Sequence, residues 1–498
     1  MNVNPITRLD YPDPDVIRVE DTYYMVSTTM HFMPGCEILQ SFDLVHWEHV
    51  TYVYETLDHT DAQQLKSGQN IYGQGMWAAS LRYHEGRFWI CFVANDTRKT
   101  YLYTSEKIDG PWKKQLIEGF YHDGSLLFDE DGRNYIVYGN DEIWITELNE
   151  DLTAPKKDGL HRLLVSDHKN PELGYEGSHI QKINGYYYIF LVHSLRDRWM
   201  RTEACFYSDS LEGEFTGGDV LCDDRGYCGQ GVAQGGIVDT PDGKWYAMLF
   251  QDSGAVGRLP ILLPVTWKDH FPFFGQNGHV PEEIEVHSTR PGYIYQPLVG
   301  SDDFCNGLLP RWQFNHDPDP RYYHLDALQG TYTITTREVC TELTQAVNTL
   351  TQRMSYPSCA AEVTVDASAL KEGDVAGLCA LQSCYAAVGI TKHHGKYEVL
   401  MLDKKEDGIL DMTEGTVVES HQMDFRLEAD FCNMKDEARC YYRVNKGDWL
   451  PIGTVHKLYF KLDHFTGCRF GLFCYAAEET GGSACFRDFK YYDVDEIS

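Results

Sequence analysis

Three acidic residues could act together although they lie far apart in the chain: Asp13 in YPDPD, Asp123 in HDGS and Glu176 in YEGS. Grouped carboxylates suit hydrolysis of a glycosidic bond, because one acid protonates the leaving oxygen while another carboxylate acts across the sugar. Like charges in one pocket also push their pKa values apart, which keeps one group protonated and another ionised. A metal site is the rival use, but no supporting set of histidines accompanies these residues.

Asp13 lies between two prolines. Pro14 disfavours helical backbone at the residue before it, so we expect Asp13 to be extended, with its carboxylate aimed in one direction. The PDP tripeptide is also common in ordinary surface turns. Its meaning therefore depends on the rest of the chain.

A repeated β pattern indicates how these residues could meet. Five segments share a turn with Gly or an acidic residue followed by an aromatic-rich run, which is the signal of a hairpin. They are VEDTYYMVS (19–27), HEGRFWICF (84–92), DEDGRNYIVY (129–138), INGYYYIFL (183–191) and TPDGKWYAML (240–249). Segments between them, such as SFDLVHWE (41–48) and SDSLEGEF (208–215), fit outer hairpins of the same units. The repeat predicts an all-β, five-bladed propeller.

Each hairpin is preceded at a nearly constant distance by a residue that could face a ligand. Counting back from Tyr23, Phe88, Tyr135, Tyr187 and Trp245 by 10, 11, 12, 11 and 11 residues leads to Asp13, Trp77, Asp123, Glu176 and Gln234. Equivalent positions in rotated blades converge at the mouth of the central channel, where a propeller can hold a ligand. The alternative is coincidence, since acidic residues are common in this chain.

The composition excludes some classes of partner. The chain has 498 residues, with 43 Lys and Arg against 75 Asp and Glu, and its net charge of −32 disfavours nucleic acid and anionic membranes. No basic start precedes an apolar run, and no segment has the length of a membrane span, so we expect a soluble, cytoplasmic protein. The 15 cysteines show no disulfide framework and are expected to be free thiols.

The ordered fragments YPDPDVIRVEDTYYMVST, GMWAASLRYHEGRFW, HDGSLLFDEDGRNY, YEGSHIQKINGYYYIF and GGIVDTPDGKWYAMLF resemble glycoside hydrolase family 43. The resemblance implies a five-bladed β-propeller and hydrolysis with inversion of anomeric configuration. It also implies that Asp13 is the general base and Glu176 the general acid. Asp123 matches the carboxylate that raises the pKa of the acid and orients it.

The same resemblance assigns further substrate-binding residues. Arg258 in AVGRLP matches an arginine that reaches the sugar, and Trp77 and Phe32 match aromatic pocket walls, although core packing is an equal alternative for both. Gln234 stands where many members carry a His that helps to order calcium or water in the channel. We expect no required cofactor, and this departure puts the channel calcium in doubt.

A second domain is expected to follow the propeller, which gives domains of 1–297 and 298–498. Alternating segments predict strands at 331–336, 360–368, 397–403, 424–431, 457–463 and 486–494, a pattern typical of a two-sheet sandwich. The domain resembles the concanavalin-like sandwich of two-domain family members, which implies that one of its loops narrows the active-site pocket. Asp303 and Asp488 could hold a structural calcium, but solvated acids are the more common case.

A pocket closed on the axis favours removal of terminal sugars. The two-domain resemblance implies an exo-acting α-L-arabinofuranosidase on arabinoxylan-derived oligosaccharides, with cleavage of terminal β-1,4-xylosyl units in the same site. The alternatives are a β-D-xylosidase, a related fructosidase that retains configuration, and a non-catalytic carbohydrate-binding protein. The sequence does not rank the two pentoses or give the oligomeric state.

Overall fold

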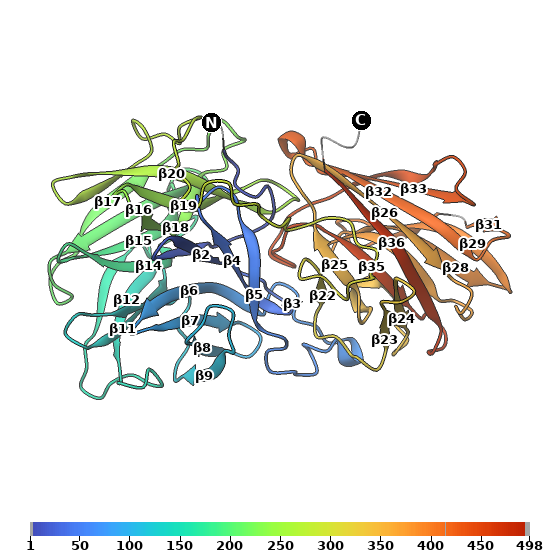
Figure 1. Cartoon of the computed structure of the whole chain (residues 1–498), viewed down its shortest axis with the longest axis horizontal. Helices are drawn as coiled ribbons and strands as arrows, with labels where there is room; N and C mark the ends of the chain where they lie inside the picture. Colours follow the sequence, from blue (N-terminus) through green and yellow to red (C-terminus); the bar gives the residue numbers. More distant parts are fainter. Residues whose placement is uncertain (1–2, 414, 494–498) are drawn as a thin grey trace.

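The computed structural model describes residues 3–413 and 415–493. Its regular structure is β-sheet, apart from three short 3₁₀ helices, η1 (Lys66–Gly68), η2 (Leu343–Gln345) and η3 (Cys432–Met434). Figure 1 shows two β-rich halves side by side, the N-terminal half in blue to green and the C-terminal half in yellow to red. The cysteines are free, as expected. Within the described ranges, no helix is long and apolar enough to cross a membrane.

The N-terminal half is the predicted five-bladed propeller, built from five four-stranded antiparallel sheets. Blade I contains β1 (Asp15–Val19), β2 (Thr22–Val26), β4 (Gly35–Ser41) and β5 (Glu48–Tyr54), and blade II contains β6 (Met76–His84), β7 (Arg87–Ala94), β8 (Lys99–Ser105) and β9 (Lys113–Ile117). Blade III contains β10 (Ser125–Phe128), β11 (Asn134–Asn140), β12 (Glu142–Leu148) and β13 (His161–Ser166). Blade IV contains β14 (Glu176–Ile183), β15 (Tyr186–Ser194), β16 (Arg201–Ser208) and β17 (Thr216–Leu221), and blade V contains β18 (Val232–Asp239), β19 (Trp245–Asp252), β20 (Arg258–Lys268) and β21 (Phe271–Phe274).

The inner hairpins form where the turn residues predict them. Asn184 and Gly185 join β14 to β15 with φ angles of 51° and 85°, and Glu85 and Gly86 join β6 to β7 with 49° and 74°. Positive φ at both central residues is what a type I′ turn requires, and its twist matches that of the strands. The segments 41–48 and 208–215 lie at the outer hairpins of blades I and IV, as expected.

A buried polar network holds the blades around the axis. Arg82 of β6 donates from Nη1 to Asp15 Oδ2 (2.8 Å) and from Nη2 to Ser125 Oγ (2.7 Å) and Ile180 O (3.1 Å). His179 Nδ1 lies 3.2 Å from Asp15 Oδ1. One guanidinium therefore joins the inner strand of blade II to those of blades I, III and IV.

The C-terminal half is the predicted two-sheet sandwich. One sheet has the order β3 (Phe32–Met33), β22 (Gln313–Asn315), β25 (Leu350–Arg353), β35 (Arg469–Tyr475), β27 (Val375–Leu381), β28 (Ala386–His393), β29 (Lys396–Lys404), β30 (Leu410–Met412), with β31 (Thr416–Val418) also paired to β29. The other has the order β23 (Tyr323–Asp326), β24 (Thr331–Thr335), β36 (Ser483–Asp493), β26 (Ser358–Asp366), β32 (Gln422–Asp430), β33 (Glu437–Val444), β34 (Leu450–Lys457).

One predicted strand is wrong. The segment 457–463 was expected to form a strand from its alternating pattern, but β34 ends at Lys457 and the chain turns at 462–464. The segment is a loop, and the ring of its Phe460 lies 5.7 Å from Arg258 Cζ of the propeller.

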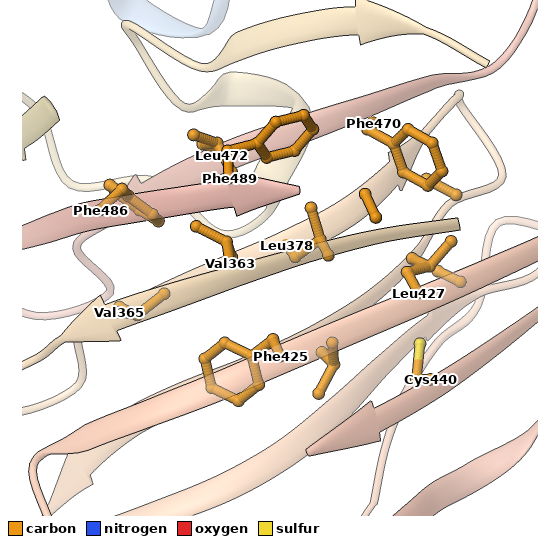
Figure 2. Packing of buried hydrophobic residues seen from close by; sticks show 14 of the residues in the cluster. Val363, Val365, Leu378, Phe425, Leu427, Cys440, Phe470, Leu472, Phe486 and Phe489 are labelled. Atoms are coloured by element: carbon orange, nitrogen blue, oxygen red, sulfur yellow. The ribbon is translucent and has the colours of Figure 1, made fainter. Parts of the chain in front are cut away.

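The sandwich core lies between its two sheets. Val363, Phe425 and Phe486 from one sheet pack against Leu378 and Phe470 from the other, and each is at most 1% exposed. Figure 2 shows these side chains filling the space between the strands. Each such residue stabilises the fold by about 1.5–3 kcal/mol through burial, so the domain is a rigid support for its loops.

The two halves share a built interface. The short strand β3, which lies between β2 and β4 in the sequence of blade I, pairs with β22 of the sandwich, with Met33 opposite Phe314. Arg353 of β25 forms a buried ion pair with Glu37 of β4 at 2.8 Å. Burial alone would raise the pKa of Glu37, but Arg353 and His49 lower it to about 2. The sandwich is thereby fixed against blade I.

Replacing Arg82 should destabilise the propeller. Arg82→Met leaves Asp15 buried without its cation, which costs about 3–5 kcal/mol. Burial raises the pKa of Asp15, but Arg82 and His179 lower it below its ordinary value. Because the pKa of Asp15 is lower in the folded protein than in the unfolded chain, its ionised form adds to the free energy of unfolding above the unfolded pKa. This contribution is lost as the pH falls through the folded pKa. The deficit of the variant should therefore be full near neutral pH and shrink below about pH 4.

Thermal and urea unfolding of wild type and variant measure this difference at each pH. Arg133→Met is the matched control, because Arg133 is 45% exposed and its ion pair is with Asp131 on the β10–β11 turn. Equal unfolding midpoints for Arg82→Met and wild type at neutral pH would contradict the role of the network.

Candidate active site

The strand starts bring the predicted residues to one end of the propeller. Glu176 is the first residue of β14, and Trp77 is the second residue of β6. Asp13 and Asp123 stand two residues before β1 and β10, and Gln234 is the third residue of β18. Because the inner strands surround a common axis, these starts form a cup at one mouth of the channel.

The backbone of the cup is irregular. Asp13, Asp123 and Gln234 have φ angles of 52°, 48° and 63°, in the left-handed region. The β ladder also shifts register directly after Trp77 and directly after Glu176. Bulges and left-handed residues of this kind re-aim side chains and cluster at functional sites.

The expected conformation of Asp13 is wrong. Its φ of 52° is left-handed, and not extended as Pro14 predicts. Thr28 Oγ1 donates to Asp13 Oδ2 at 2.5 Å, and Arg258 Nη1 lies 3.2 Å from Oδ1 and 3.4 Å from Oδ2. These tertiary contacts outweigh the local preference, and Asp tolerates the left-handed region better than most residues. Asp13 is 6% exposed and lies at the floor of the cup.

Asp123 and Glu176 are joined through backbone and side chains. Asp123 Oδ2 accepts a hydrogen bond from Gly177 N at 3.0 Å, next to the acid in sequence. Gly177 has a φ of 66°, and a Cβ there would lie 2.7 Å from Gln234 Cγ, so glycine is required at this position. Asn140 Nδ2 at the end of β11 donates to Glu176 Oε2 at 3.1 Å. The Glu176 side chain is 20% exposed and marks the open side of the cup.

His122 lies between the two acids. Its Nε2 is 3.5 Å from Asp123 Oδ2 and 3.5 Å from Glu176 Oε2. Burial lowers the pKa of His122, but the two carboxylates raise it to about 9. Burial raises the pKa of Asp123 to about 6, with His122 opposing this shift and the charges of Glu176 and Asp13 adding to it. The charges of Glu176 and Asp13 therefore oppose the ionisation of Asp123.

The sandwich closes one side of the cup. The Phe465 ring, in the loop after β34, lies 4.2 Å from Arg258 Cζ and 5.5 Å from the Trp77 ring. Arg258 Nη2 donates to the Phe465 carbonyl at 3.2 Å. The Trp77 ring is in turn 6.1 Å from His122. Two aromatic rings and a guanidinium thus stand beside the carboxylates, as sugar recognition requires.

Phe32 lies elsewhere. It is 1% exposed and packs in a sandwich cluster with Leu343 and Tyr385, while Arg469 Cζ lies 3.4 Å above its ring. These contacts place Phe32 in the domain interface. Core packing, the alternative weighed from the sequence, describes it better than an open pocket wall.

Gln234 does not fit a calcium ligand. Its backbone N–H donates to Glu203 Oε2 at 2.7 Å, and burial raises the pKa of Glu203 well above its ordinary value. The Glu203 carboxyl and the Gln234 amide offer fewer oxygens than the six or more that calcium takes. Among the described residues, the cluster with metal-ligand spacing is His122, Asp123 and Glu176. Asp303 and Asp488 are not part of a described cluster of this kind.

Sequence reasoning missed five residues at the cup: Thr28, His122, Asn140, Phe465 and Arg201, which lies within reach of the charges of Glu176 and Asp13. His122 was detectable as the neighbour of Asp123. Arg201 was detectable by repeat alignment, because it opens β16 of blade IV as Arg258 opens β20 of blade V. Thr28 follows β2, the second strand of blade I, and Asn140 ends β11, the second strand of blade III. No sequence pattern at these positions indicates a chemical role.

Comparisons with known proteins identify both halves of the chain. The model of "Glycosyl hydrolases family 43" matches residues 3–272, and that of "Beta xylosidase C-terminal Concanavalin A-like domain" matches residues 301–492. A β-xylosidase of Formosa agariphila is 26% identical over 99% of this chain and 89% of its own length. Xylosidase/arabinosidase 43B of Humicola insolens is 26% identical, with 98% of this chain and 96% of that protein covered.

A solved structure of a bifunctional GH43-CE protein of Bacteroides eggerthii superposes with a TM-score of 0.93 at 41% identity. The match covers 100% of this chain, which spans 64% of the length of that protein. The family model alone covers more than half of the chain. The chain is therefore a glycoside hydrolase and belongs to glycoside hydrolase family 43.

Proposed function

We propose that the cup removes terminal pentosyl units from arabinoxylan-derived oligosaccharides with inversion, cleaving both α-L-arabinofuranosyl and β-1,4-xylosyl linkages in one pocket. The observation that carries this proposal is the convergence of Asp13, Asp123 and Glu176 beside Arg258. The names β-xylosidase and xylosidase/arabinosidase of the relatives support both activities and favour xylosyl units as the better substrate. The family resemblance named α-L-arabinofuranosidase activity first, while the sequence itself did not rank the two pentoses.

Asp13 acts as the general base in this proposal. Thr28 and Arg258 fix its carboxylate, so that it accepts a proton from a water molecule as the water oxygen attacks the anomeric carbon. Glu176 gives its proton to the glycosidic oxygen as the bond from that oxygen to the anomeric carbon breaks. The two acids act from opposite sides of the sugar, which inverts the configuration.

Asp123 orients the acid and opposes its ionisation. Its hydrogen bond to Gly177 N fixes the backbone next to Glu176, and its negative charge disfavours a second charge nearby. His122 acts in the opposite sense, because its raised pKa keeps a cation beside both carboxylates at neutral pH.

The walls of the cup favour a terminal sugar. Phe465 and Trp77 flank the carboxylates, and Arg258 closes the floor against Asp13, so a chain has no path through the cup. The proposed chemistry needs only these protein groups and water. A carbohydrate-binding protein, the alternative of another class, does not require an aligned base and acid.

The leaving group separates the two catalytic roles. Glu176→Ala should lower kcat/KM on xylobiose by about 10²–10⁴-fold, because the sugar oxygen must be protonated. The same variant should change β-D-xylosyl fluoride hydrolysis by less than about tenfold, because fluoride leaves without a proton. Asp13→Asn should lower both activities by about 10²–10⁴-fold, because water activation serves both substrates.

Initial rates on the two substrates, with folding checked by circular dichroism, test this assignment. If Asp13→Asn loses activity on aryl arabinofuranoside and aryl xyloside to the same extent, one pocket serves both sugars. An active Asp13→Asn enzyme, or a first product of retained configuration in proton NMR of the wild type, would contradict the base role. A wild-type protein inactive on xylobiose, β-D-xylosyl fluoride and both aryl pentosides would favour the carbohydrate-binding alternative.

His122 should set the alkaline limit of activity. Its imidazolium stabilises the ionised carboxylates, so His122→Asn makes them harder to ionise and keeps the acid protonated to higher pH. The alkaline limb of the kcat/KM profile should move up by about one pH unit. The control is His84→Asn at the opposite end of the channel, where His84 stacks on Phe128 and should not affect the profile. An alkaline limb that stays in place or moves down would refute this role.

A further inference from the structure

Trp199 is an exposed aromatic residue beside the cup. It lies in the loop 195–200 between β15 and β16 and is 44% exposed. Glu176 pairs with Val192 and Ser194 pairs with Arg201, so this loop emerges at the same end of blade IV as the acid. Single exposed aromatic residues are common on protein surfaces, but one at the mouth of a sugar site indicates a contact with the ligand.

The loop that carries Trp199 is held in one conformation. Met200 N donates to Ser194 Oγ at 2.8 Å, and Leu195 N donates to Met200 O at 3.1 Å. Arg196 forms an ion pair with Asp167 on the neighbouring segment. The position of the indole is thus fixed by its flanking residues, while its own ring remains open.

Arg201 links Trp199 to the catalytic groups. Its Cζ lies 5.3 Å from the Trp199 ring and 5.2 Å from the Phe250 ring, and Arg258 Cζ lies 5.5 Å from the same Phe250 ring. Arg201 is buried and paired with Asp252. Burial and the charge of Arg258 lower the pKa of Arg201 to about 10, while the charges of Glu176 and Asp13 oppose this shift. One guanidinium therefore separates the exposed indole from the groups that cleave the bond.

We propose that Trp199 is the platform for the leaving-group sugar, the pyranose on the far side of the scissile bond. This inference rests on the proposed function. Glu176 protonates the leaving oxygen and lies on the open side of the cup in blade IV, so the leaving unit extends over the same blade. The face of an indole packs against the C–H groups of a pyranose. Arg201 supports the ring from the protein side as a positioning residue.

The platform explains how a pocket with one closed end can still prefer oligosaccharides. Binding energy from the leaving sugar holds the scissile oxygen against Glu176 without any further contact to the terminal unit. A substrate that lacks a leaving sugar gains nothing from Trp199. This difference is the basis of the test.

The experiment compares xylobiose with β-D-xylosyl fluoride, which carries no sugar in the leaving position. Trp199→Ala should lower kcat/KM on xylobiose by about tenfold and leave the fluoride within about twofold, while Trp199→Phe should retain most of the xylobiose activity. Phe273→Ala is the matched control, because Phe273 is 49% exposed on the outer strand β21 and should leave both rates unchanged.

Equal losses on the two substrates would show a structural role of Trp199 and overturn the proposal, as would unchanged rates on both. A wild-type chain that hydrolyses the fluoride and xylobiose, with an unaffected Trp199→Ala variant, would leave the proposed function intact and remove this inference alone. A wild type inactive on both would remove the two together.

Discussion

The bonds of Arg82 at the propeller axis are the constraint on which the catalytic cup depends. This residue joins Asp15, Ser125 and Ile180 from three other blades, and Ser125 Oγ also accepts a hydrogen bond from Ile180 N at 3.0 Å. Asp15 and Ser125 each stand two residues after a cup carboxylate, and Ile180 stands four residues after the third. Because the partners are buried, a small displacement of one strand would leave charged groups unsatisfied. The network therefore fixes the distances between carboxylates that belong to different blades.

The irregular backbone above this network gives the cup its shape. Regular strands would alternate their side chains between the two faces of each blade, and left-handed residues with register shifts redirect them at the strand starts. Asp13 and Asp123 share this left-handed geometry in two blades, and Gly177 supplies it beside Glu176. The conformational cost is offset by hydrogen bonds made only in this geometry, such as those from Thr28 and Gly177 N.

The sequence was sufficient for the fold class, and its nearly constant offset led to three acidic residues that the structure places at one end of the propeller. It failed where tertiary contacts oppose a local rule. Pro14 predicts an extended Asp13, but Arg258 and Thr28 hold the residue in a left-handed conformation. The alternation at 457–463 predicts a strand, yet the loop there leads to Phe465, which contacts Arg258 of the propeller. Contacts between segments more than 200 residues apart leave no periodic trace in either segment.

The central claim is that acids from three blades surround one terminal sugar. Its most direct test is a crystal structure of the inactive Glu176→Gln variant with xylobiose. The account predicts the terminal xylose inside the cup, with Asp13 and residue 176 on opposite sides of the anomeric carbon and Phe465 against the ring. A disaccharide bound instead in the cavity of about 420 Å³ at the other end of the channel, lined by Lys182 and Trp245, would contradict it.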